Sequence, residues 1–351
     1  MPAFFGDPIL TGSISSPRGL HTLESYLVYI LARLVIGFFR VFPRSPGVWL
    51  IRILATLAYY LDFRHRHIAG VNLRIAFPEL SERDRSRIAR RSFQNTAMNL
   101  LEISRLPSLT QANIASLVAY DENQGLDNYR AALARGKGIL YLTGHFSSWE
   151  LLPSAHALHG YPLSFITRPL DNSLLERYLL RIRESKGNQV INKKNSARHI
   201  LKNLQSGGSA GILMDQNTSL QEGVFVDFFG VPAATTTSVA LFALRTDSPV
   251  LPGYLTPMRQ GCYRIKFLPP IDVIRTGDRV CDLEVNTRRF NEVLECIVRE
   301  QPESWLWGHK RWKNQPPGNP QDLYRLSRRE LSDFLEKNNS KAQASNQGRS
   351  L

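Results

Sequence analysis

Apolar runs alternate with segments of helical periodicity along most of this chain. Apolar runs predict strands at 138–143, 163–167, 189–191, 210–214, 250–255 and 264–268. Helical patterns predict helices at 147–158, 174–185, 196–205, 237–244 and 284–300. Strands alternating with helices are typical of an α/β sheet that carries helices on both faces. We therefore expect an α/β domain over residues 64–315.

Two apolar segments precede this domain, at 26–42 and 48–63. The first has 17 residues and contains Arg33 and Arg40, whereas a spanning helix needs about 20 apolar residues. Arg33 and Arg40 are seven apart and share a helix face, which suits a helix in the membrane interface or a tilted anchor with snorkelling arginines. An ordinary buried helix fits the pattern equally well. Because two such segments occur in tandem, we expect residues 1–63 to form membrane-anchoring helices.

The charge of the chain indicates which classes of partner it binds. The formal net charge is +14 and the pI is near 9.9, which favours a polyanionic partner, either nucleic acid or an anionic membrane. Arginines are dense between 64 and 91, where a helix is predicted to begin at Ser81. The three cysteines are widely spaced and form no Cys-x-x-Cys motif, as expected for reduced thiols in a cytosolic setting. The polar tail, 316–351, is expected to be disordered after about Asn338.

Candidate chemistry centres on the end of the strand at 138–143. His145 follows the strand, Ser147 or Ser148 is placed to cap the next helix, and Glu150 falls in its first turn. We expect Glu150 to accept a hydrogen bond from one ring nitrogen of His145 and leave the other nitrogen as a general base. A glutamate in a first turn also occurs for helix stability alone. The spacing is not that of a His-Glu-x-x-His zinc motif, so we expect no metal.

Polar residues follow two further strands. Arg168 follows the strand at 163–167, and the pair Asp215 and Gln216 follows the strand at 210–214. Arg168 is suited to bind a phosphate or a carboxylate, and a surface arginine before proline fits the pattern equally well. Arg183 lies on the next helix, where it would face either the site or solvent. The apolar stretch 223–237 resembles a mobile loop that walls a greasy substrate, although packing would also account for its aromatic residues.

The segment from Trp305 to Lys313 holds three tryptophans, one histidine and three basic residues among its nine. Interleaved aromatic and basic side chains suit a membrane interface or single-stranded nucleic acid. No signature of a common nucleic-acid-binding module accompanies them.

Five blocks together resemble one family, the lipid A biosynthesis acyltransferases, also called late acyltransferases, within the lysophospholipid acyltransferase superfamily. The blocks occur in family order between about residues 25 and 315, and they are 144–150, 168–172, 215–216, 228–237 and 305–313. Two departures are present: Ser173 stands where the family often has proline, and Gly308 precedes His-Lys where relatives usually carry His-Arg.

The resemblance implies a central mixed sheet flanked by helices, as in glycerolipid acyltransferases, with membrane-associated N-terminal helices. It implies an enzyme at the cytoplasmic face of the cell inner membrane. Such an enzyme moves a fatty acyl chain from acyl carrier protein to a hydroxyl of a Kdo-bearing lipid A precursor, without a cofactor. The family dyad falls on His145 and Glu150, and Arg168, Arg183, Asp215 and Gln216 become candidate substrate-binding residues.

Alternatives differ in acceptor or in class. Sister enzymes acylate other glycolipids, such as phosphatidylinositol mannosides, or lysophospholipids. A non-enzymatic RNA- or membrane-binding protein would explain the charge but not the His-x4-Glu spacing. A serine hydrolase would need Ser147 or Ser148 as nucleophile, and its flanks lack Gly-x-Ser-x-Gly. We expect acyl carrier protein, a glycolipid acceptor and an anionic membrane as partners, and no nucleic acid.

Overall fold

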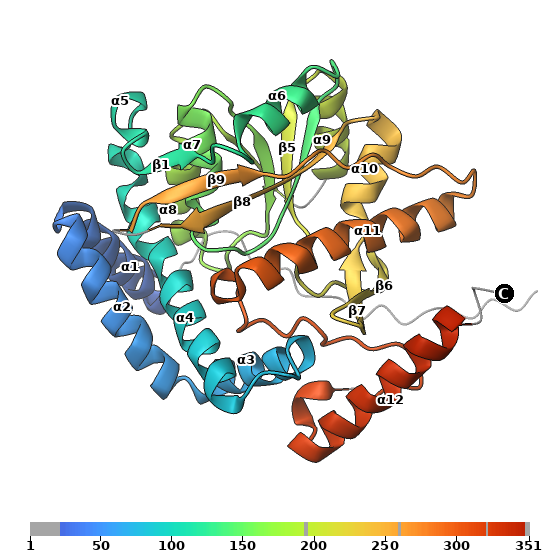
Figure 1. The fold of residues 1–351 in the computed structure, drawn as a ribbon. Coiled ribbons are helices and arrows are strands. Elements are labelled where there is room, and N and C mark those ends of the chain that lie inside the picture. Colours follow the sequence, from blue (N-terminus) through green and yellow to red (C-terminus); the bar gives the residue numbers. More distant parts are fainter. Residues whose placement is uncertain (1–21, 193–195, 259–260, 321, 348–351) are drawn as a thin grey trace, which may run out of the picture.

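The computed structural model describes residues 22–192, 196–258, 261–320 and 322–347. Within these ranges a seven-stranded sheet has the order β1-β9-β8-β2-β5-β3-β4 (Figure 1). β8, β2, β5, β3 and β4 are parallel, whereas β9 is antiparallel to β8 and pairs in parallel with β1. The strands are β1 (Val118–Tyr120), β2 (Ile139–Thr143), β3 (Ser164–Thr167), β4 (Gln189–Asn192), β5 (Ser209–Leu213), β8 (Val250–Pro257) and β9 (Tyr263–Phe267). The predicted mixed α/β sheet is confirmed.

Helices cover both faces of this sheet, because alternate residues of each buried strand point to opposite sides. Leu140 and Leu142 of β2 join one core cluster, while Ile139 and Tyr141 join a second. The helices are α1 (Leu23–Val41), α2 (Arg44–Leu61), α3 (Phe63–Ala76), α4 (Glu82–Arg105), α5 (Gln111–Ile114), α6 (Leu126–Leu133), α7 (Leu151–Leu158), α8 (Ser173–Glu184), α9 (Ser196–Gln205), α10 (Ser238–Thr246), α11 (Arg279–Glu300) and α12 (Arg328–Gln347). Short 3-10 turns are η1 (Leu106–Ser108), η3 (Pro302–Ser304) and η4 (Leu323–Arg325).

The stretch predicted as a mobile loop is an antiparallel hairpin of β6 (Gly223–Phe228) and β7 (Val231–Thr236). Phe229 and Gly230 form its turn with φ of 53° and 70°, the left-handed geometry that matches the twist of a two-residue hairpin. Phe228 and Phe229 are buried in the core. The prediction of a mobile substrate wall was therefore wrong, and packing accounts for these aromatic residues.

The Trp305–Lys313 segment is also part of the core. Trp305, Trp307 and Trp312 are at most 1% exposed, and Arg311 is fully buried. Arg311 donates to Ala234 O and to the Thr235 hydroxyl. The interpretation of this segment as an aromatic and basic contact surface was wrong, because its tryptophans fill the interior.

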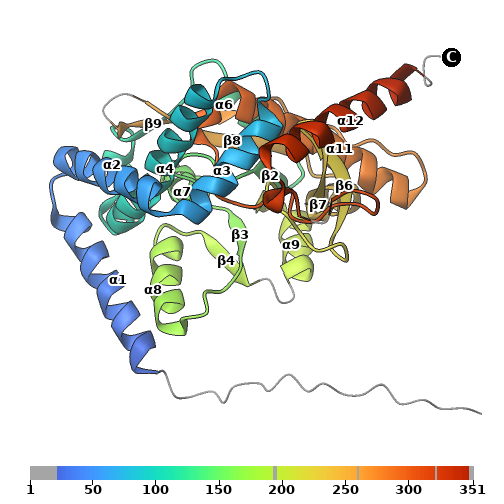
Figure 2. The same ribbon diagram turned by 90° about the horizontal axis from the view of Figure 1, so that it is seen from below.

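The N-terminal apolar segments form α1 (Leu23–Val41) and α2 (Arg44–Leu61), both of which pack against α4 and lie at one end of the molecule (Figures 1 and 2). The first 21 residues of the predicted anchoring region lie outside the described residues. Within the described residues, neither these helices nor any other combines the length and the apolar character needed to cross a bilayer.

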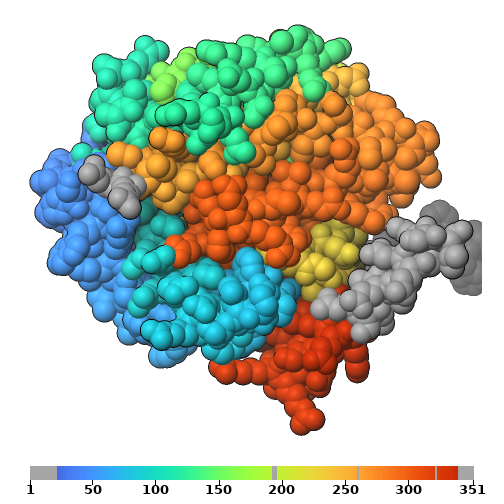
Figure 3. Space-filling model, viewed as in Figure 1, coloured from blue at the N-terminus to red at the C-terminus, as the bar shows by residue number. Residues whose placement is uncertain are grey.

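Many large apolar side chains on α1 and α2 face outward, and the two helices form the blue surface in Figure 3. We call this surface the apolar helical surface; it comprises Leu23, Leu27, Ile30, Leu31, Leu34, Phe38 and Val41 of α1 and Trp49, Leu54, Leu57, Tyr60 and Leu61 of α2. The membrane association predicted for these helices stays a prediction.

A buried ion pair connects α2 to the body of the protein. Arg44 makes two hydrogen bonds to Glu102, at 3.0 and 2.8 Å, and a third to Gly261 O. Glu102 is fully buried and also accepts from the Tyr263 hydroxyl at 2.9 Å, which in turn accepts from Ser148. This chain of contacts runs from the start of α2 to the loop that follows β2.

The C-terminal tail contains a helix that the sequence patterns did not predict. α12 continues to Gln347, whereas disorder was expected after about Asn338. A capping box begins the helix, since Ser327 N donates to Glu330 and Glu330 N donates to the Ser327 hydroxyl. Leu331 packs into the core. Residues 348–351 lie outside the described residues.

Candidate active site

His145 and Asp215 meet at one edge of the sheet. β2 and β5 are parallel neighbours with Thr143 opposite Leu213, so the residues that follow these two strands lie at the same level. His145 N donates to Asp215 Oδ2 at 2.8 Å, and His145 Nδ1 bonds to Asp215 Oδ1 at 2.9 Å. Because a carboxylate accepts, Nδ1 carries the proton of the neutral ring, and Nε2 keeps its lone pair.

The Asp215 carboxylate is held in the interior. It is 1% exposed and also accepts from Trp305 Nε1 at 2.8 Å. Burial alone would raise its pKa, but the charge of His145 and the hydrogen bonds from His145 and Trp305 outweigh burial and lower the pKa of Asp215 to about 2. Asp215 is therefore an anion that orients the imidazole, and it does not line the cavity as a substrate-binding residue would.

The predicted contact between Glu150 and His145 is wrong. Glu150 instead pairs with Arg183 of α8 through two hydrogen bonds, Nε to Oε2 at 3.0 Å and NH2 to Oε1 at 2.7 Å. The prediction assumed a helical turn from Ser147 onward, but α7 begins only at Leu151. Burial disfavours the Arg183 cation, yet the two bonds and the charge of Glu150 outweigh burial and raise the pKa of Arg183.

Residues 144–150 form an irregular loop, because their backbone and side-chain polar groups make hydrogen bonds to other parts of the protein instead of to one another in a helix. Ser147 has a φ of 50°, and its N donates to Ser304 O at 2.7 Å. Asn99 of α4 donates to Ser147 O and accepts from Glu150 N. Ser148 donates its hydroxyl to Tyr263.

Neither serine is placed to act as a nucleophile. Ser147 and Ser148 are at most 2% exposed, and neither lines the cavity beside His145. The serine-hydrolase alternative therefore loses its nucleophile. The capping role predicted for them is also wrong, since Glu150 takes the position before α7.

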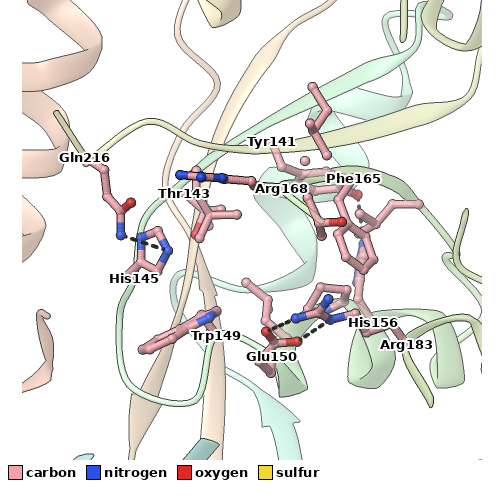
Figure 4. Close-up of a pocket in the computed structure, with 18 of the residues that line it drawn as sticks. Tyr141, Thr143, His145, Trp149, Glu150, His156, Phe165, Arg168, Arg183 and Gln216 are labelled. Carbon is pink, nitrogen blue, oxygen red and sulfur yellow. Dashed lines mark hydrogen bonds and ion pairs between the residues drawn. The ribbon is translucent and has the colours of Figure 1, made fainter. Parts of the chain in front are cut away.

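A cavity of about 420 Å³ opens beside the imidazole (Figure 4). Five of the six residues predicted for the site line it: His145, Glu150, Arg168, Arg183 and Gln216. The other lining residues are mostly apolar or aromatic, and they are Tyr141, Thr143, Trp149, Leu152, Pro153, His156, Leu163, Phe165, Ile166, Thr167, Gly211, Leu213, Gly253 and Phe267.

Polar groups gather on the His145 side of the cavity. Gln216 Nε2 lies 3.2 Å from His145 Nε2, so its amide donates to the ring lone pair (Figure 4). The Trp149 ring packs edge-on against the imidazole at 5.0 Å between centroids. Arg168 is exposed and lines the cavity, as Arg183 does, so two guanidinium groups border it. The arrangement joins an oriented base, two cations and an apolar chamber.

Sequence reasoning missed three supporting residues. Asn99 lies far from the site in sequence and nothing in the local pattern marks it, whereas Trp305 stands in a segment that was interpreted as a contact surface and not as a donor to Asp215. His309 accepts from Asn217 N at 3.1 Å, and burial lowers the pKa of His309 to about 4, so it is neutral. The partner of His145 had a usable signal, because Asp215 also follows an apolar strand at the sheet edge.

Comparison with known proteins decides the family. Residues 19–314 match the family described as bacterial lipid A biosynthesis acyltransferase. This chain belongs to that family. The predicted resemblance is confirmed, and the protein is an acyltransferase, which excludes the non-enzymatic alternative.

Alignments with curated relatives extend over most of this acyltransferase. The lipid A biosynthesis lauroyltransferase of Escherichia coli K12 is 27% identical over 76% of this chain and 85% of its own length. A lipid A biosynthesis acyltransferase of Haemophilus influenzae is 24% identical over 80% of this chain and 92% of its own length. The lipid A biosynthesis palmitoleoyltransferase of E. coli K12 is 26% identical over 73% and 81%.

The low pKa of Asp215 predicts a pH dependence of stability. The folded-state pKa, about 2, lies below the ordinary aspartate value of 3.8, so this group stabilises the fold above about pH 4 and loses that contribution as pH falls towards 2. The difference corresponds to about 2 kcal/mol. Urea unfolding of the acyltransferase at pH 6 and pH 3 should show a smaller loss for Asp215→Asn than for the parent. Asp127→Asn, which changes an 88% exposed carboxylate, is the control and should leave the loss unchanged.

Proposed function

We propose that this acyltransferase moves a fatty acyl chain from acyl carrier protein to a hydroxyl of a lipid A precursor of the Kdo-lipid IVA type. The observation that carries the proposal is the oriented imidazole of His145 at the mouth of a largely apolar cavity. The names of the relatives, which are lauroyl-, palmitoleoyl- and myristoyltransferases of lipid A biosynthesis, support both the acyl chain and the acceptor.

In the proposed reaction the acceptor hydroxyl displaces the Gln216 amide from His145 Nε2 and gives its proton to that nitrogen. The hydroxyl oxygen then attacks the thioester carbonyl carbon and forms a tetrahedral oxyanion. The C–S bond breaks, and the imidazolium returns the proton to the departing thiolate. Asp215 keeps the ring oriented and stabilises the imidazolium, as the carboxylate does in a Ser-His-Asp triad.

We assign the two cavity arginines to the stabilisation of negative charge on the substrates. Arg168 and Arg183 both face the chamber, where they are positioned for the thioester oxyanion or for a phosphate of the acceptor. Glu150 uses both carboxylate oxygens on Arg183, which favours a role in positioning that guanidinium over a role as base. Gln216 contacts the reacting nitrogen and belongs to the same substrate-contacting set.

We further propose that the protein acts at the cytoplasmic face of the inner membrane, with the apolar helical surface in the lipid interface. Exposed leucines on one face of α1 suit a helix that lies in the membrane surface. α1 also reaches the cavity region, since Ser25 O accepts from Asn172, the N-cap residue of α8. An acceptor held in the same leaflet would then enter from the lipid side.

The basic residues of α3 and α4 are assigned to the acidic carrier protein. Arg66, Arg83, Arg87 and Arg90 line a groove beside Tyr59 and Tyr60. Two neighbouring arginines of α4 make ion pairs, Arg85 with Glu82 and Arg91 with Glu303. Arg311 is buried and belongs to no such surface.

The first test of this function addresses the base. His145→Ala should lower the rate of acyl transfer by about 10²–10⁴, the usual contribution of a general base. Asp215→Asn should cause a loss of similar order, and the double variant should be little worse than His145→Ala, because the pair acts as a unit. The assay is transfer from acyl carrier protein to a purified lipid A precursor in detergent, followed by mass spectrometry.

Ser148→Ala is the matched control, since it alters the same loop without touching the cavity, and it should keep most of the activity. Undiminished transfer by His145→Ala would contradict the mechanism. If the parent protein failed to acylate the lipid A precursor but acylated another glycolipid, the proposed acceptor would be wrong, and His145 would keep its assignment as the base.

The second test addresses the membrane. Leu27, Leu31 and Leu34 share one exposed face of α1, and their replacement by glutamate should lower binding to anionic vesicles more than tenfold. Flotation of the purified full-length protein measures this binding. Val280→Glu changes an apolar residue that is 72% exposed on α11 and should have no effect. Equal flotation of the triple variant and the parent would show that the apolar helical surface does not bind the membrane.

The third test addresses the carrier. Arg83→Glu with Arg90→Glu should raise KM for acyl carrier protein roughly three- to tenfold at low salt, because rim charges steer association. The effect should shrink as salt rises. Arg130→Glu with Arg279→Glu reverses two exposed charges on other helices and is the control. A KM that stays constant at low salt would rule out this groove as the carrier contact.

A further inference from the structure

The far end of the active-site cavity has a polar floor. Tyr141, Phe165 and His156 lie across the cavity from His145 and Gln216 (Figure 4). Tyr141 precedes Thr143 by two residues on the same face of β2, which puts it roughly 7 Å further along the strand. Apart from Thr143, Arg168 and the Glu150–Arg183 pair, the remaining lining residues are mostly apolar, so a chain that enters from His145 along these residues would stop at the polar groups of the floor.

His156 is fixed by two short hydrogen bonds. Its Nδ1 lies 2.8 Å from the Tyr120 hydroxyl, and its Nε2 lies 2.8 Å from the Tyr141 hydroxyl. Burial lowers the pKa of His156 to about 3, so the ring is neutral and has one donor and one acceptor. The two tyrosines supply the matching acceptor and donor, and both ring nitrogens are satisfied.

Aromatic rings enclose the same imidazole. Tyr129, Tyr161 and Phe267 have ring centroids 5.1, 5.2 and 5.2 Å from that of His156. The ring is 1% exposed. A methylene group pushed past this point would have to separate buried hydrogen-bonded partners and leave them unsatisfied, which is costly in a low-dielectric interior.

We propose that His156, held between Tyr120 and Tyr141, is the floor of the acyl-chain pocket and sets the longest chain that this enzyme transfers efficiently. The inference rests on the proposed function, because it takes the cavity beside His145 as the site of the donor acyl chain. The imidazole is a specificity-determining residue and takes no part in the reaction, since it lies at the opposite end from the base.

Gly211 supplies an independent way to change the same pocket. It lies opposite Tyr141 in the β2–β5 register and opposite Phe165 in the β3–β5 register. A Cβ at this position would meet Leu163 Cδ1 at 3.3 Å and Phe165 Cβ at 3.9 Å. Gly211 lines the cavity, as do Leu163 and Phe165. A methyl group there would remove space, whereas loss of the His156 ring would add space.

The experiment compares chain-length profiles of the full-length enzyme with acyl carrier protein loaded with saturated chains of increasing length. The readout is the ratio of kcat/KM for the chain two carbons longer than the parent's optimum to that for the optimum. His156→Ala should raise this ratio up to about 15-fold, since each of the two methylenes that are newly buried contributes about fourfold. Gly211→Ala should lower it and move the optimum to a shorter chain.

His159→Ala is the matched control: His159 follows α7 three residues after His156, bonds to Val118 O and lies outside the cavity lining. It should leave the ratio unchanged. If His156→Ala does not fold, Gly211→Ala alone decides the result. A parent-like ratio in every folded variant would overturn the floor assignment.

Binding of free fatty acids, followed by the fluorescence of Trp149 in the cavity, separates this inference from the proposed function. A length cut-off that shifts with His156→Ala, in a protein that fails to acylate the lipid A precursor, would retain the floor and reject the acceptor. Acyl transfer to the precursor without any shift in either profile would retain the function and reject the floor.

Discussion

The buried carboxylate of Asp215 is the interaction on which the site depends. It accepts from the backbone and ring of His145 and from the indole of Trp305, and thereby ties the end of β2, the end of β5 and the C-terminal tryptophan segment together. A buried carboxylate is stable as an anion only when such donors compensate for lost hydration. The same bonds that stabilise the anion orient the imidazole, so structural and chemical requirements coincide in one side chain.

The second carboxylate of the site has a different electrostatic role. Glu150 is neutralised by Arg183 through a two-bond pair, and Asn99 holds its backbone. The two acids of the site therefore act on different partners: Asp215 on the imidazole and Glu150 on a guanidinium. Separate partners keep the base and the cation in separate places along the cavity wall, with Trp149 beside the imidazole.

The apolar helical surface and the active-site loop belong to one connected structure. Arg44, at the start of α2, bonds to buried Glu102, which accepts from Tyr263, and Tyr263 accepts from Ser148 in the loop after His145. Breaking a buried pair by removal of one partner leaves an uncompensated charge, so this connection resists displacement of α2 relative to the loop. The position of the exposed helices relative to the cavity is set by these interior contacts.

Sequence patterns by themselves determined the order of strands and helices from β2 to α11 except the β6–β7 hairpin, the α/β class, the position of His145 at a strand end and the family. Apolar runs and capping residues such as Asn172 are local signals, and local geometry follows from them. The hydrogen-bond partner of the imidazole was decided by the tertiary structure. Glu150 is five residues from His145 and Asp215 is seventy residues away, but only strand order brings β5 beside β2, and sequence spacing carries no information on that order. The interior position of the tryptophan segment was also decided by the tertiary structure. The sequence of a segment rich in Trp, Lys and Arg does not distinguish a surface position from a core position until the neighbouring elements are known.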